Sequence, residues 1–119
     1  MELNFIVIQV LHRLGVYKGY SGFDYIIFAI KLIDSDIDYL CFITKSLYID
    51  IAKEFTTSYV CVEKNIRTVV NKIWDDMDLN KEMIAEIFGN YYLCHKPSNR
   101  EFLFRKRTER KKRRNNSSQ

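Results

Sequence analysis

The stretch that decides the fold is IAKEFTTSYVCVEKNIRTVVNKIWDD, residues 51–76. An apolar run ends at Phe55, and a corner of three hydroxyl-bearing residues follows it. From Val62 to Met77, apolar side chains recur every three or four residues, which is the spacing of one buried helix face. This order predicts a short helix, a tight polar turn and a longer amphipathic helix.

We expect the shorter helix over residues 48–55, with Phe55 facing inward. The longer helix is expected over residues 58–76, with Thr57 or Ser58 as its N-cap. A short bracing helix, a compact turn and a helix whose outer face is polar form a helix-turn-helix. In that motif the second helix enters the major groove of DNA and places its N-terminal residues on base edges. An ordinary amphipathic helix with a solvated outer face is the alternative explanation of the pattern.

The outer face of the longer helix carries side chains suited to base edges. Arginine and lysine donate to the O6 and N7 atoms of guanine, and glutamate accepts from N4 of cytosine. The predicted base-reading residues are Glu63, Lys64 and Arg67.

The rest of the chain also favours helices, because it holds one proline and four glycines. A first helix is expected over residues 4–14, with Phe5 facing inward, and Gly15 ends it. Residues 34–50 are expected to be an irregular or single-turn passage apart from the start of the short helix, and residues 91–94 can form a brief extended piece. The remaining expected helices cover residues 21–33 with Ser21 as the cap, residues 81–88 up to Gly89, and a last segment that starts near Ser98 or Asn99. The fold class is therefore all-α, with about six helices.

Composition argues against an enzyme, a metal site or a cofactor. The three cysteines include no C-x-x-C pair, so neither a zinc site nor a disulfide framework is expected. Asp34, Asp36 and Asp38 alternate as in a calcium loop, but the glycine and glutamate of that loop are missing. His12 and His95 lack the sequence context of a catalytic set.

No run of apolar residues approaches the length that a membrane span needs. The apolar N-terminal stretch follows Glu2 and has no basic region before it, so it does not resemble a signal peptide. A cytoplasmic protein without membrane contact is expected.

Charge divides the chain into a helical domain, residues 1–104, and a basic tail, residues 105–119. Residues 100–119 hold nine Lys or Arg and two Glu, whereas residues 1–99 hold ten basic and thirteen acidic side chains. A tail of this kind is expected to be disordered when free and suits a polyanion, although a purely solubilising tail is the alternative. Its predicted nonspecific DNA contacts are Arg105, Lys106, Arg107, Arg110, Lys111, Lys112, Arg113 and Arg114.

The sequence resembles a known family. The block ITKSLYIDIAKEFTTSYVCVEKNIR, followed by IFG and KPSNREF, is similar to the C-terminal effector domain of the sporulation initiation response regulator, stage zero protein A. The similarity runs from about Leu11 to Phe102. It implies a six-helix, winged-helix-like response-regulator effector domain whose third and fourth helices form the helix-turn-helix. No receiver domain is expected before the first helix.

The resemblance also implies which residues act. In the family the V-E-R-x-x-R residues read a GC-containing element of the TGTCGAA kind, and they correspond here to Glu63, Lys64 and Arg67. Lys64 stands where the family usually has arginine, and Cys61 also replaces an arginine. The family's K-P-x-N loop touches the DNA backbone, and the last helix helps tandem copies meet on DNA. The full set of predicted backbone contacts is Lys45, Thr57, Ser58, Tyr59, Asn71, Lys96, Ser98, Asn99 and Arg100.

The predicted function is a sequence-specific transcription regulator, linked to sporulation or stationary-phase gene control, that binds double-stranded DNA at the bacterial nucleoid. Homodimers or tandem copies on DNA are expected, with a full-length regulator or RNA polymerase as further partners. One alternative is a receiver-less paralogue that modulates a full-length regulator by direct interaction. Another is a nonspecific nucleic-acid binder driven by its tail.

Overall fold

The computed structural model describes residues 2–104, and they are almost entirely helical. No strand occurs among these residues, so they contain neither a β-wing nor the parallel sheet of a receiver domain. The elements in order are α1 (Glu2–Arg13), α2 (Ser21–Ser35), the 3-10 turn η1 (Ile37–Leu40), the π-helical turn η2 (Ile43–Tyr48), α3 (Ile49–Phe55), α4 (Tyr59–Asp75), α5 (Met77–Ile87), the 3-10 turn η3 (Asn90–Leu93) and a helix at residues 99–104. The all-α fold expected from the sequence is confirmed.

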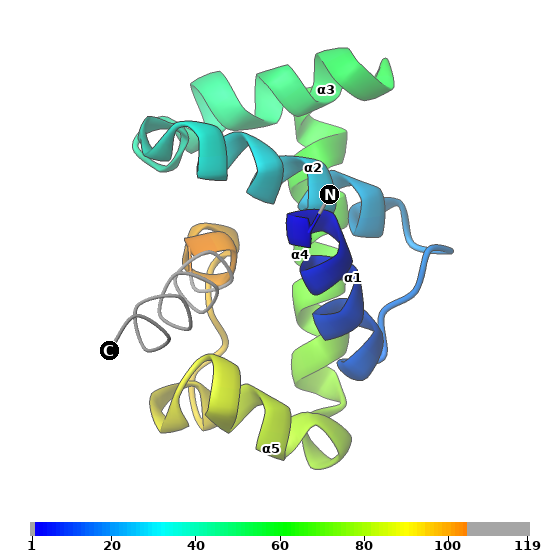
Figure 1. Cartoon of the computed structure of the whole chain (residues 1–119), viewed down its shortest axis with the longest axis vertical. Coiled ribbons are helices and arrows are strands. Elements are labelled where there is room, and N and C mark those ends of the chain that lie inside the picture. Colours follow the sequence, from blue (N-terminus) through cyan, green and yellow to red (C-terminus); the bar gives the residue numbers. More distant parts are fainter. Residues whose placement is uncertain (1, 105–119) are drawn as a thin grey trace.

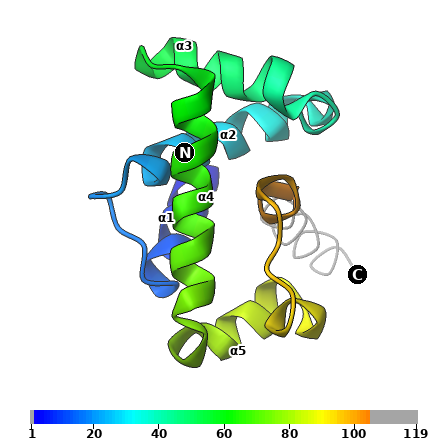
Figure 2. The same ribbon diagram turned by 180° about the vertical axis from the view of Figure 1, so that it is seen from behind.

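The long helix α4 is the axis of the molecule (Figures 1 and 2). α3 lies across its N-terminal end, α5 turns away from its C-terminal end, and α2 packs against its side. The α2–α4 crossing is very close, since a Cβ atom on Gly22 would lie 2.4 Å from the carbonyl oxygen of Asn65. α4 is therefore held on several sides, and one long face stays exposed (Figure 2).

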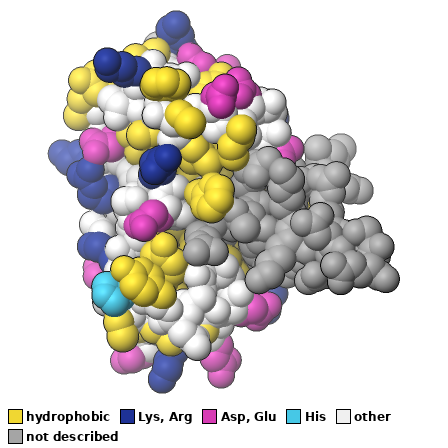
Figure 3. Space-filling view, turned by 90° about the vertical axis from the view of Figure 1, so that its left-hand side faces the viewer, with side chains coloured by type: hydrophobic (Ala, Val, Ile, Leu, Met, Phe, Trp, Pro, Cys, Tyr) yellow, Lys and Arg dark blue, Asp and Glu magenta, His cyan; other side chains and the backbone are white. Residues whose placement is uncertain are grey.

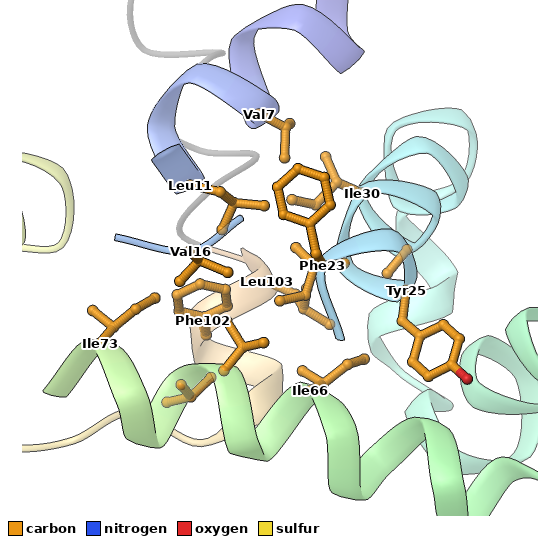
Figure 4. Close-up of a cluster of buried hydrophobic side chains, with 14 of the residues drawn as sticks. Val7, Leu11, Val16, Phe23, Tyr25, Ile30, Ile66, Ile73, Phe102 and Leu103 are labelled. Carbon is orange, nitrogen blue, oxygen red and sulfur yellow. The ribbon is translucent and has the colours of Figure 1, made fainter. Parts of the chain in front are cut away.

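The predicted apolar stripe of α4 is buried. Val62, Ile66, Val69, Val70 and Ile73 are each at most 1% exposed. Residues from both ends of the described chain fill the other side of this core (Figure 4), including Leu11 of α1 and Phe102 and Leu103 of the last helix. The core thus joins segments that lie about ninety residues apart in the sequence.

An aromatic cluster fixes the last helix to the C-terminal half of α4. The Trp74 ring meets Phe88 edge-on at 5.2 Å between centroids, and Phe88 stacks on Phe102 at 5.3 Å. The indole Nε1 of Trp74 donates a hydrogen bond of 2.7 Å to the carbonyl oxygen of Tyr92, which satisfies its buried polar atom. The buried Asn80 amide likewise donates to the Ile73 carbonyl at 2.9 Å and ties α5 to the end of α4.

Three side-chain expectations were wrong. Phe5 is 63% exposed, because Val7 and Leu11 form the buried stripe of α1 instead. Phe55 is 38% exposed, although its ring packs edge-on against Tyr25 and Phe28. Ser21 does not cap α2, since Tyr20 occupies the N-cap position and makes no side-chain cap bond.

Several predicted boundaries also shift. Asp76 separates α4 from α5, so Met77 begins α5 rather than extending the α4 stripe, and α5 starts four residues before the predicted helix. Residues 90–93 form the turn η3 in place of an extended piece. The stretch expected to be irregular or single-turn contains two short helical turns, η1 and η2, and Asp36 caps η1 by accepting from the amide of Asp38 at 3.0 Å. Gly89 does end α5 as expected, with a φ of 103°.

Candidate nucleic-acid interface

The helix-turn-helix consists of α3, a three-residue turn and α4. Thr56 closes α3 in the left-handed region, with φ 53° and ψ 56°. The amides of Thr56 and Thr57 both donate to the carbonyl oxygen of Ala52, which caps the end of α3. A β-branched residue rarely adopts this backbone conformation, so the surrounding contacts must hold the turn in place. The turn therefore sets the angle between the two helices.

Ser58 is the N-cap of α4, in agreement with the prediction that Thr57 or Ser58 fills this role. Its Oγ accepts a hydrogen bond of 3.1 Å from the amide of Cys61. The preceding amides at Tyr59 and Val60 belong to the first turn of α4, where backbone donors lack an intrahelical acceptor. The start of α4 thus offers free backbone donors and the positive end of the helix dipole at the protein surface.

The exposed face of α4 carries the three predicted base readers. Lys64 and Arg67 are exposed and Glu63 is half-buried. The Arg67 guanidinium and the Glu63 carboxylate form an ion pair across one helical turn. Figure 3 shows Lys and Arg side chains gathered along one edge of the molecule. The three side chains therefore share one face of α4, and base reading by them stays a prediction.

A groove separates this face from the segment that leads into the last helix. Glu63, Arg67 and Asn71 line one wall, and residues 96–100 line the other. The Lys96 Nζ bridges the walls by donating a hydrogen bond of 2.6 Å to the Asn71 Oδ1. The structure therefore brings together two sets of predicted DNA contacts that lie about thirty residues apart in the sequence.

Asn99 joins three elements at the base of this groove. Its Nδ2 donates to the hydroxyl of Tyr48 at 3.0 Å and to the backbone carbonyl of Glu63 at 3.1 Å. Both amide hydrogens are thus used within the protein. Burial raises the pKa of the Tyr48 phenol, and the phenol oxygen accepts this bond. The side chain of Asn99 locks the start of the last helix against η2 and α4.

Ser98 and Arg100 also make internal bonds. Ser98 and Glu101 form a capping box, in which the Ser98 Oγ accepts from the Glu101 amide at 3.2 Å and the Glu101 Oε1 accepts from the Ser98 amide at 2.9 Å. The Nε of Arg100 donates to the carbonyl oxygen of Leu40 at 2.7 Å. The last helix therefore begins where the sequence predicts, and it is anchored to η1 as well as to α4.

Two further predicted backbone contacts, Lys45 and Tyr59, lie on different elements. Lys45 is exposed on η2, and Tyr59 is an exposed residue that lines a hollow with Lys53 and Thr57 beside α3. The eight tail residues, Arg105 to Arg114, lie outside the described residues. Sequence reasoning overlooked Tyr48 as a support of the interface, because its partner Asn99 lies 51 positions along the chain.

The described residues contain neither a cluster of metal ligands nor a membrane-spanning helix. Within residues 2–104, no three His, Cys, Asp or Glu side chains lie together in a way that could hold a metal ion. None of the helices described is long and apolar enough to cross a membrane.

Comparison with known families agrees with this geometry. The family model described as sporulation initiation factor Spo0A C terminal matches residues 7–117, which is most of the chain. The match confirms the family resemblance carried by the helix-turn-helix block and the segment before the last helix. The chain belongs to the Spo0A C-terminal family, the DNA-binding effector domain of a sporulation regulator.

Proposed function

We propose that the protein is a sequence-specific transcription regulator that reads the major groove with α4, in sporulation or stationary-phase gene control. The observation that carries this proposal is the exposed face of α4. Glu63, Lys64 and Arg67 lie there, directly after a capped and rigidly closed turn. A recognition helix needs this arrangement, because its N-terminal half must project from the body of the protein. Membership of the DNA-binding family supports the same role.

The backbone contacts belong to two groups. Thr57, Ser58 and Tyr59 surround the start of α4, where free amides and the helix dipole favour a phosphate. Lys45, Lys96 and Arg100 supply positive charge beside the groove, and Asn71 orients Lys96. Ser98 and Asn99 act indirectly, by fixing the position of the segment that carries Lys96. Both amide hydrogens of Asn99 are donated to groups within the protein. The basic tail adds sequence-independent affinity. Tandem pairing on DNA and contacts with a full-length regulator or RNA polymerase remain predictions.

Selection of DNA by the full chain tests the proposal. Duplexes enriched from a random pool at near-physiological salt should share a short motif that contains G·C pairs. The chain should bind this motif at least about a thousandfold more tightly than a scrambled duplex. Footprinting of genomic fragments should then protect the same motif. A selected pool that is no richer in any motif than the starting pool would contradict sequence-specific reading.

Restoring the arginine that the family usually has is expected to tighten specific binding. Lys64 is exposed on the outer face of α4, so an arginine can be accommodated there without a change in packing. The planar guanidinium can donate to O6 and N7 of one guanine together, whereas an ammonium makes a point contact. We expect Lys64→Arg to raise affinity for the selected duplex by about fivefold to tenfold and to leave affinity for the scrambled duplex unchanged. Equilibrium fluorescence anisotropy measures both.

Lys81→Arg on α5 is the matched control, because it makes the same exchange at an exposed position outside the helix-turn-helix. It should change neither affinity. If Lys64→Arg weakens binding to the selected duplex, position 64 reads a group other than a guanine edge.

A further inference from the structure

Val60 is the apolar member of the outer face of α4. At 100° per residue, Val60 falls within an arc of about 60° that also contains Lys64, Arg67 and Asn71. It lies on the first turn of the helix, at the end that enters the major groove in a helix-turn-helix. Val60 thus shares a helix face with the predicted base readers Lys64 and Arg67, although its side chain is apolar and theirs are charged.

The described residues leave this side chain outside the hydrophobic core. Val60 is 53% exposed and belongs neither to the core nor to the partly buried side chains packed against it. The side chains of the two adjacent residues, Tyr59 and Cys61, make other contacts. Tyr59 lines the hollow beside α3, and the Cys61 Sγ accepts a hydrogen bond of 3.2 Å from the Asn65 amide. Since a β-branched residue also has a low helix propensity, valine offers no local advantage at this exposed position.

We propose that Val60 is a specificity-determining residue that contacts the C5 methyl group of a thymine. The inference rests on the proposed function. In the major groove, thymine is distinguished by this methyl group, and an apolar side chain recognises it by excluding water from both surfaces. The contact places a thymine beside the base pairs that Lys64 and Arg67 read, because all three side chains lie along one face of the helix.

Removal of single methyl groups from the DNA tests the inference. The probe is the duplex that the full chain selects, with each thymine replaced in turn by deoxyuridine, which lacks only the C5 methyl. One replacement should lower the affinity of the full chain about fourfold, the size expected for one buried methyl group. Val60→Ser should bind the thymine and uracil duplexes equally well, and circular dichroism should show that it keeps the native helix content.

Leu79→Ser is the matched control, since Leu79 is 85% exposed on α5 and loses comparable apolar surface. This variant should retain the fourfold difference between thymine and uracil.

Two results would overturn the inference while leaving the proposed function intact. The chain can select a motif in which no uracil replacement has an effect. Alternatively, the fourfold difference between thymine and uracil can persist in Val60→Ser; if the variant also binds both duplexes more weakly, Val60 makes another contact. If the chain selects no motif at all, the inference and the proposed function fail together.

Discussion

Gly22→Ala is expected to lower the free energy of unfolding by about 2–3 kcal/mol, in the range of overpacking substitutions in protein cores. The new methyl group would lie 2.4 Å from the carbonyl oxygen of Asn65 and 2.7 Å from the Cγ2 of Val69. The nearest atom belongs to helix backbone, so relief requires α2 and α4 to move apart. An unhindered glycine-to-alanine change in a helix would instead stabilise the protein by about 1 kcal/mol. Urea denaturation followed by circular dichroism measures the difference.

Gly19→Ala provides the matched control. A Cβ atom at Gly19 would meet nothing within 4 Å, so this substitution should change the free energy of unfolding by less than about 0.5 kcal/mol. If Gly22→Ala proves as stable as the native chain, the helices separate easily and the tight crossing does not constrain α4. The stability of Gly22→Ala bears on DNA binding, because α2 supports the side of α4 that faces away from the groove.

The sequence predicts α4 well because one strong periodicity determines it. Its buried residues, its Ser58 cap and its exposed Lys64 and Arg67 all follow from a single stripe and a single polar corner. The prediction for α1 fails at Phe5 because the N-terminal run is apolar on several faces. Two stripes are then available, and only packing against α2 and the last helix selects the one that contains Val7.

The candidate site could be predicted only in part, for a related reason. A local sequence pattern is enough to identify the exposed side chains of one helix. The groove, in contrast, depends on pairs such as Lys96 with Asn71 and Arg100 with the Leu40 carbonyl. These partners lie 25 and 60 positions apart, and no sequence period relates them. The same holds for Asn99, which sequence similarity marks as a DNA contact and the structure shows as a brace between η2 and α4. The Ser98–Glu101 capping box is local, and its spacing could have been recognised in the sequence.

Arg67→Ala is expected to lower affinity for the selected duplex by about tenfold to a hundredfold, which corresponds to roughly 1–3 kcal/mol for a base-edge contact. The guanidinium lies along the outer face of α4, paired with the Glu63 carboxylate. Affinity for a scrambled duplex should fall by no more than about threefold, since only one of many positive charges is removed. The variant should also distinguish guanine from the other bases less strongly at one position of the motif.

The fold should not account for this loss. The Arg67–Glu63 pair is solvent-exposed, and such pairs contribute about 0.3–0.5 kcal/mol to stability, so urea denaturation should be nearly unchanged. Lys81→Ala on α5 removes the same charge from an exposed site and should leave both affinities close to the native values. Equal losses on the selected and scrambled duplexes would mean that Arg67 touches phosphate alone. The assignment of base reading would then move towards Lys64 and the first turn of α4, because those residues share the outer face and lie closer to the end that enters the groove.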